Sequence, residues 1–261
     1  MKQIARIIVF IIIPVFIIVS CNQKTGKEPD NKIPEINEQG FDSSRLLPLG
    51  ELYKAERFES LEEAVKQRDR VYKLIIYGKG LKKLSPDIKK LAYLNTLELT
   101  ANELTDLPAE LAELKYLQSL YISKNQFRHV PEVIFELDNL KRINIGQSTL
   151  KYIPGSLIKM ESIEELKLDA CYIREIPDSL YYMPNLKVLS LNSNYLDTIL
   201  PEIQQLKKLE VLEIKKNQIN TLPMEITSLK NLKRLEIKGN NIPRPIIDSL
   251  AKQMPGTKIL Y

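Results

Sequence analysis

The sequence is poor in several residue types, and each shortage excludes a class of protein. Its 261 residues include only 9 Gly and 2 Cys, which excludes a collagen-like chain and a disulfide scaffold. A single His and two Cys leave little material for the common metal sites or for Ser-His and Cys-His nucleophiles. Because 44% of the residues are apolar, the chain is able to build a core and is not wholly disordered.

The chain also carries no large excess of positive or negative charge. The chain has 38 Lys plus Arg against 33 Asp plus Glu. Lys2 and Arg6 lie in a segment that we expect to be removed, which leaves 36 basic residues against the 33 acidic ones. So small an excess does not indicate a nucleic-acid partner. No P-loop, G-x-G-x-x-G, H-E-x-x-H or EF-hand spacing is found. We therefore expect no enzymatic activity, no cofactor and no metal.

Residues 1–20 predict a signal peptide. Lys2 and Arg6 begin it, and an uncharged run of 13 residues follows over 7–19. At about 1.5 Å per residue this run is shorter than the ~30 Å hydrocarbon layer and fits a signal-peptide core. It ends in Ile-Val-Ser-Cys, which resembles the bacterial lipoprotein signal, in which the cysteine is lipidated and becomes the mature N-terminus. An uncleaved anchor or a plain secretory signal is the alternative, and in each case we expect export.

The lipoprotein resemblance implies that acyl chains such as palmitate on Cys21 hold the protein at a bacterial membrane. Since Asn22 rather than Asp follows this cysteine, the resemblance favours the outer membrane, with the domain facing the periplasm or the cell surface. Residues 21–44 are polar, with Pro, Gly and charge, and predict a flexible tether. Once Cys21 is acylated, Cys171 has no disulfide partner within the chain.

Most of the remaining chain repeats a unit of 23 residues without gaps. The eight units begin at Val71, Leu94, Leu117, Leu140, Ile163, Leu186, Leu209 and Leu232. Positions 1, 4, 6 and 11 of every unit are apolar. Alternating apolar residues at positions 4 and 6 face one side of a short strand. Stacking these strands at ~4.8 Å predicts a parallel sheet with its apolar face in the core.

Position 9 of the unit is usually Asn, whose side chain turns inward and satisfies backbone groups of neighbouring loops. The five asparagines are Asn102, Asn125, Asn194, Asn217 and Asn240, and the departures are Lys79, Ser148 and Cys171. We expect Ser148 to do part of this and Cys171 hardly any, so Cys171 is interpreted as a packed, inert thiol rather than a reactive site. Prolines after position 11, such as Pro108, predict short helical or 3-10 turns.

The pattern L-x-x-L-x-L-x-x-N-x-L followed by L-P-x-x-I-x-x-L resembles the leucine-rich repeat family of the 23-residue bacterial type, over residues 71–261. This resemblance implies an α/β fold: a right-handed solenoid, or horseshoe, with a parallel sheet on the concave side and short turns on the convex side. We assign residues 71–242 to repeats, and residues 45–70, including a helix over 60–68, to an N-terminal cap. An amphipathic helix and a closing strand predict a C-terminal cap over 243–261.

The side chains free to contact a partner lie at positions 3, 5, 7 and 8 of the repeats. Near the N-terminal end they include apolar and aromatic residues, which either bind a partner or are covered by residues 41–53. Near the C-terminal end they include charged columns, which form either a solvated charge ladder or a surface that steers a partner. The candidate partner-binding residues are Ile75, Tyr77, Tyr121, Arg142, Lys167, Glu213, Lys215, Arg234, Glu236 and Lys238.

These observations predict a non-catalytic, monomeric module that binds a protein or peptide. Catalysis has no support, because His129 lies in a turn of the third repeat while Cys171 points into the core two repeats later. His129 is interpreted as an ordinary surface residue. The alternative function is glycan binding or an envelope-structural role, with Tyr77 and Tyr121 as stacking platforms, although the absence of Trp argues against it.

Overall fold

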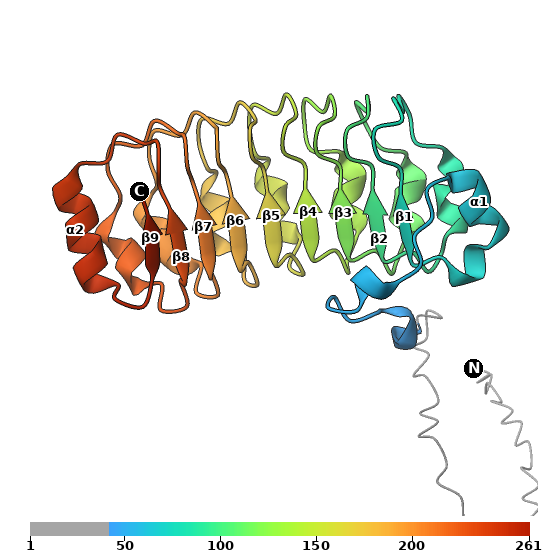
Figure 1. Ribbon diagram of the computed structural model, residues 1–261, viewed down its shortest axis with the longest axis horizontal. Coiled ribbons are helices and arrows are strands. Elements are labelled where there is room, and N and C mark those ends of the chain that lie inside the picture. The colour runs from blue at the N-terminus through green and yellow to red at the C-terminus, as the bar shows by residue number, and fades with distance from the viewer. Residues whose placement is uncertain (1–41) are drawn as a thin grey trace, which may run out of the picture. The chain divides into compact units, whose positions relative to one another are not determined.

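The computed structural model describes residues 42–261, so the predicted signal peptide, Cys21 and nearly all of the predicted tether lie outside the described residues. Nine strands form one parallel, uncurled sheet in which each strand pairs with the next in the chain (Figure 1). The strands are β1 (Lys73–Ile75), β2 (Thr96–Glu98), β3 (Ser119–Tyr121), β4 (Arg142–Asn144), β5 (Glu165–Lys167), β6 (Val188–Ser190), β7 (Val211–Glu213), β8 (Arg234–Glu236) and β9 (Lys258–Leu260). From β1 to β8 each residue pairs with the residue 23 positions later, as Leu74 does with Leu97, so equivalent side chains form straight columns.

One face of the sheet is covered by short 3-10 helices, and the other is open (Figure 1). The helices are η4 (Pro86–Lys90), η5 (Ala109–Glu113), η6 (Glu132–Glu136), η7 (Gly155–Lys159), η8 (Asp178–Tyr182), η9 (Pro201–Gln205) and η10 (Met224–Ser228). Proline fixes φ at their beginnings, as Pro108 does before η5, where the Leu111 N–H then donates to the Pro108 carbonyl at 3.0 Å. The predicted turns are therefore 3-10 helices in the first seven repeats, whereas the eighth is followed by the α-helix α2 (Arg244–Gln253).

The core lies between the sheet and these turns. In the second repeat, Leu97 and Leu99 from the strand and Leu111 from the turn are fully buried. The same positions are buried in the other repeats up to the seventh, and the buried side chains form one continuous cluster from Phe58 to Met254. No single repeat has enough apolar surface to enclose such a cluster, so each repeat is stabilised by its neighbours. The predicted leucine-rich repeat solenoid is confirmed.

The inward asparagines join consecutive repeats through main-chain groups. Asn125 donates from Nδ2 to the carbonyls of Leu99 and Ile122 at 2.9 and 3.0 Å, and its Oδ1 accepts from the Leu104 N–H at 2.9 Å. Ser148 does not replace this arrangement, because its buried Oγ has no hydrogen-bond partner among the described residues. The expectation that Ser148 does part of the task was wrong, since the shorter side chain does not reach the neighbouring loop.

Cys171 is buried as expected. Only 3% of the residue is exposed, and its Sγ lies 3.6 Å from the Asp169 carbonyl oxygen. Burial raises the pKa of the thiol, so the unreactive protonated form is favoured.

The two ends of the stack are closed by helices. Helix α1 (Leu61–Lys66) begins after Ser60, whose Oγ accepts a hydrogen bond from the Glu63 N–H, and it ends before the predicted boundary because Gln67 leaves the helical conformation. The short helix η3 (Arg68–Arg70) follows it. At the other end, α2 (Arg244–Gln253) packs its apolar side on the last repeat before β9. Within residues 42–261 no helix is both long and apolar enough to cross a membrane.

The segment before α1 packs against the residues that precede β2 and β3. It contains η1 (Ser43–Arg45) and η2 (Leu52–Lys54). The Asp42 N–H donates to the Tyr116 hydroxyl at 2.6 Å, and the Leu47 N–H donates to Asn95 Oδ1 at 2.8 Å. Gln118 in turn donates to the Leu47 carbonyl at 2.7 Å. The expectation that the flexible tether extends to residue 44 was therefore wrong, because polar side chains preceding β2 and β3 hold residues 42–47.

Candidate functional site

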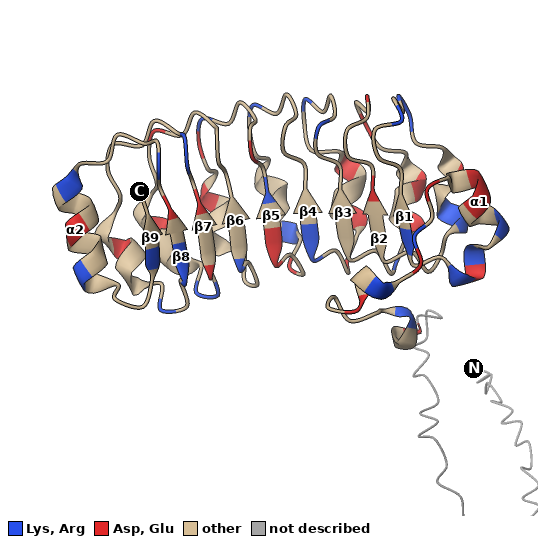
Figure 2. Ribbon diagram, viewed as in Figure 1, with Lys and Arg blue, Asp and Glu red and all other residues tan. Residues whose placement is uncertain are grey.

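The candidate site is the open face of the sheet, which we define as the side chains at positions 3, 5 and 7 of the eight repeats. These side chains alternate with the buried ones and point away from the 3-10 helices. Figure 2 shows both acidic and basic residues together on β5 and β8, with further charged residues on β4 and β7, whereas β1 and β2 each carry charge of one sign. The open face therefore has a charged C-terminal part and a more apolar N-terminal part.

The predicted aromatic patch at the N-terminal end is only partly accessible. Ile75 is 8% exposed, whereas Tyr77 is 50% exposed and Tyr121 is half-buried. Ile75 follows the bridge between Leu74 and Phe58, and its N–H donates to the Phe58 carbonyl at 2.8 Å. Ile75 is therefore buried next to a strand edge that pairs with Phe58 rather than with residues 41–53, and Tyr77 is left on the surface.

The charged columns near the C-terminal end neutralise each other. Glu213 and Glu236 are paired neighbours on β7 and β8, and Arg234 contacts the carboxylates of both. Lys215 Nζ lies 2.7 Å from Glu236 Oε2, and this hydrogen bond raises the pKa of Lys215. The Glu236 side chain is only 9% exposed, and its carboxylate is paired with both Lys215 and Arg234. Lys238, by contrast, is exposed and has no ion pair within residues 42–261.

Hydrogen bonds extend this network toward β5 through residues that sequence reasoning missed. Ser190 Oγ lies 2.6 Å from Asp169 Oδ1 and 2.8 Å from Glu213 Oε2. The Asn192 N–H donates to Asp169 Oδ1 at 2.7 Å, and Asn192 Oδ1 accepts from the Lys215 N–H at 2.8 Å. The signal that could have found them is a run of polar residues at positions 5 and 7 of the repeats that begin at Ile163 and Leu186.

Arg142 and Lys167 belong to a second cluster on β4 and β5. Arg142 Nε lies 3.5 Å from Glu165 Oε2, and Lys167 Nζ lies 2.5 Å from Glu165 Oε1. Burial lowers the pKa of Lys167, but the hydrogen bond to Glu165 and nearby negative charges outweigh it, so the pKa is raised. The structure thus places the charged candidates in two clusters in which most side chains are held by a partner.

In the described part of the chain, no group of three or more His, Cys, Asp and Glu residues could hold a metal ion. His129 is exposed on a loop, whereas Cys171 is buried. What the open face offers is a set of oriented charges and hydrogen-bonding groups, which is suited to recognition.

Family comparisons agree with this architecture. Residues 70–194 match the leucine-rich repeat region family, and residues 184–242 match the leucine rich repeat family. The chain belongs to the leucine-rich repeat proteins, whose members are generally non-catalytic binding scaffolds. A comparison with curated proteins finds no significant match.

Solved structures give particular relatives. A leucine-rich repeat protein of Leptospira interrogans is 31% identical with a TM-score of 0.64, and the match covers 77% of this chain but 57% of that one. Internalin C2 of Listeria monocytogenes is 24% identical with a TM-score of 0.65, covering 75% and 82%, which shows the fold alone. A receptor kinase ectodomain of Arabidopsis thaliana, solved in complex with Casparian strip integrity factor 2, is 25% identical with a TM-score of 0.54, covering 66% and 24%.

Proposed function

We propose that this chain is a non-catalytic lipoprotein of the bacterial cell envelope that binds a protein or peptide through the open face of its sheet. The observation that carries the proposal is the charged part of that face, where side chains are oriented by one another and not covered by the helices. Because these groups are already ordered, a partner orders fewer side chains on binding. The receptor ectodomain solved with its factor supports a protein or peptide as the ligand class.

The charge pattern supports a role in choosing the partner. Paired charges such as Glu236 with Lys215 contribute little further attraction, but they set the position in which a complementary surface fits. Lys238, which has no ion pair among residues 42–261, is able to attract an acidic group, and Tyr77 offers aromatic contact area at the other end of the sheet. We therefore expect an elongated partner whose contacts extend over several strands.

Matched variants test the binding face. Tyr77→Ala and Lys238→Glu change the open face, whereas Tyr182→Ala and Lys159→Glu make the same changes on the opposite, helical face. Tyr77 and Tyr182 are equally exposed, at 50% and 52%. We expect the first pair to reduce the capture of envelope proteins by the purified chain and the second pair to leave it unchanged. Equal effects of the two pairs would exclude the open face as the binding surface.

Anchoring is proposed from the N-terminal sequence, in which a basic start and an apolar run precede Cys21. The test is fractionation of cells that express the wild type or Cys21→Ser, with protease added to intact cells. Loss of the membrane-bound form in Cys21→Ser would support the lipid anchor, and equal fractionation of both forms would contradict it. Protease sensitivity of the anchored wild type would indicate the cell surface, and protection would indicate the periplasm.

A second candidate function, glycan binding, is favoured by one observation. The rings of Tyr172 and Tyr195 stack with centroids 6.0 Å apart and 17° between their planes, and both residues are exposed. Arg174 lies over the Tyr195 ring at 5.9 Å. Exposed aromatic faces beside a cation suit an anionic sugar. Binding on a glycan array that Tyr195→Ala abolishes and Tyr182→Ala retains would support this candidate, and an array without binding would contradict it.

A further inference from the structure

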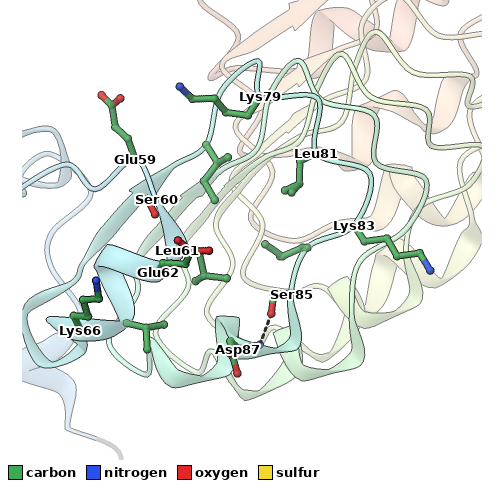
Figure 3. Close-up of a pocket in the computed structure, with 13 residues that line it drawn as sticks. Glu59, Ser60, Leu61, Glu62, Lys66, Lys79, Leu81, Lys83, Ser85 and Asp87 are labelled. Atoms are coloured by element: carbon green, nitrogen blue, oxygen red, sulfur yellow. Dashed lines mark hydrogen bonds between the residues drawn. The ribbon is translucent and has the colours of Figure 1, made fainter.

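A groove separates helix α1 from the first repeat (Figure 3). Its volume is about 780 Å³. Leu61 and Val65 of α1 form one wall, Leu81 and Leu84 of the loop after β1 form the other, and Ile76 also lines it. A cavity of this size with an apolar lining is large enough for several side chains of a ligand.

The interior repeats show which backbone hydrogen bonds a loop makes when another repeat precedes it. At each of the seven junctions between repeats, the N–H at position 8 donates to the carbonyl at position 7 of the following repeat, as Ala101 does to Ser123 at 3.0 Å. At the same seven junctions, the N–H at position 10 donates to the carbonyl at position 11 of the preceding repeat, as Gln126 does to Leu104 at 2.8 Å. A loop is therefore paired on both sides when a repeat lies on both sides.

The loop of the first repeat has no such neighbour on the side of α1. By the register of the seven junctions, the Gly80 N–H and the Tyr77 carbonyl face that side, and neither has a hydrogen-bond partner in the described part of the chain. Phe58 pairs with β1 itself but extends no further than the Ile75 N–H. The strand edge is thus covered, and the loop edge is open.

The rim of the groove has an excess of free positive charge. Lys66, Lys79 and Lys83 have no ion pair among residues 42–261. Two of the three acidic residues at the groove are already paired: Asp87 lies 2.9 Å from Lys90, and Glu59 lies 3.0 Å from Arg57. Glu62 has no ion pair within the described part of the chain. A ligand with acidic groups beside its apolar side chains would complement this rim.

We propose that this groove binds an extended peptide segment of a partner protein, which adds to the open loop edge in the way that a preceding repeat would. A carbonyl of the peptide accepts from the Gly80 N–H, and an N–H of the peptide donates to the Tyr77 carbonyl. An apolar side chain of the peptide enters between Val65 and Leu81, and acidic side chains lie beside Lys79 and Lys83. This site adjoins the open face of the sheet at Tyr77, whose side chain belongs to that face, and it differs from that face in using the backbone of the first loop.

The chain itself contains a suitable probe. Residues 99–108, Leu-Thr-Ala-Asn-Glu-Leu-Thr-Asp-Leu-Pro, make both types of junction bond to the third repeat and contain two acidic residues. A fluorescein-labelled peptide of this sequence would be titrated with the purified full chain in detergent, and its polarisation measured. We expect saturable binding, which a scrambled peptide does not show.

Variants of the groove locate the binding. We expect Val65→Asp and Lys79→Glu each to raise the Kd of the peptide about tenfold. Lys151→Glu makes the same charge reversal on the loop of an interior repeat and should leave the Kd unchanged. Circular dichroism melting of each variant establishes that the fold is retained, and Lys79 is exposed, so its replacement does not disturb the core.

Three results would overturn the proposal. One is the absence of saturable binding up to about 1 mM peptide, since the probe has every feature that the groove is proposed to recognise. Another is equal binding by the wild type and by folded Val65→Asp and Lys79→Glu. The third is a dimer of the chain that the peptide dissociates, which would make the occupant a second copy rather than a partner peptide.

Discussion

Replacing Cys171 by Asn is expected to stabilise the protein, because it would restore bonds that the other asparagines make. In the next repeat, Asn194 donates to the carbonyls of Leu168 and Leu191 at 2.8 and 3.1 Å and accepts from the Ile173 N–H at 3.2 Å. At Cys171 the Sγ lies 4.0 Å from the equivalent carbonyl, that of Ile145. The equivalent N–H, that of buried Leu150, has no hydrogen-bond partner within the described residues.

The expected change in the free energy of unfolding follows from the hydrogen bonds of these groups. A buried N–H without a partner costs about 1–3 kcal/mol, and each new intramolecular hydrogen bond contributes about 0.5–1.5 kcal/mol net. Desolvation of the Asn amide and the slightly larger side chain offset part of this gain. We expect the free energy of unfolding to rise by about 1–3 kcal/mol, which corresponds to a Tm increase of about 2–4 °C per kcal/mol in a domain of this size.

The assay is urea and thermal unfolding followed by circular dichroism, under reducing conditions. Cys171→Ser is the control, because it removes the thiol without supplying an amide that reaches both repeats. Asn194→Cys is the reciprocal change and should lower the stability by a similar amount, since it removes the four hydrogen bonds of the Asn194 side chain. If folded Cys171→Asn were less stable than both the wild type and Cys171→Ser, the reasoning from unpaired backbone groups would be refuted.

Three further predictions follow from particular contacts. Gly146→Ala should lower the free energy of unfolding in urea by about 1–3 kcal/mol, because a Cβ there would lie 2.7 Å from the Asp169 carbonyl oxygen. Gly256→Ala is the control and should change this free energy little, because nothing lies within contact distance of a Cβ there. Asn95→Ala should speed amide hydrogen exchange in residues 42–47, because the Leu47 N–H and the Arg45 carbonyl lose their partner; unchanged exchange would contradict the proposed role of Asn95. Burial raises the pKa of the Cys171 thiol, so iodoacetamide at about pH 8 should label it slowly in the folded chain and rapidly in urea. Equal labelling rates, measured by mass spectrometry, would contradict its burial.

The sequence alone determined the repeat and the core. Positions 4 and 6 of each unit predicted buried strand residues such as Leu97 and Leu99, because the strand period places them on one side of the sheet. Asn at position 9 predicted side-chain amides that point inward, because each unit contacts its neighbours in an equivalent way. Ser148 was misjudged because reach depends on side-chain length and backbone position, which the residue type does not reveal.

The open face was only partly predictable. The 23-residue step placed Glu213 beside Glu236, as the structure confirms, because equivalent residues pair across parallel strands. The same step did not reveal that Ser190 lies between Asp169 and Glu213, since that contact depends on side-chain conformations on three strands. The pairing of Phe58 with the edge of β1 was likewise not revealed, because Phe58 lies outside the repeats.

The ends of the stack mark the limit of what periodicity determines. A repeat pattern specifies the contacts between equivalent units, so the interior of this protein follows from its sequence. The cap has no equivalent unit, and its fit depends on how α1 and the preceding segment pack on the first repeat. Only the tertiary structure therefore decided that Tyr77 stays exposed and that residues 42–47 are held by side chains preceding β2 and β3. It also decided that a groove beside Leu81 is left open.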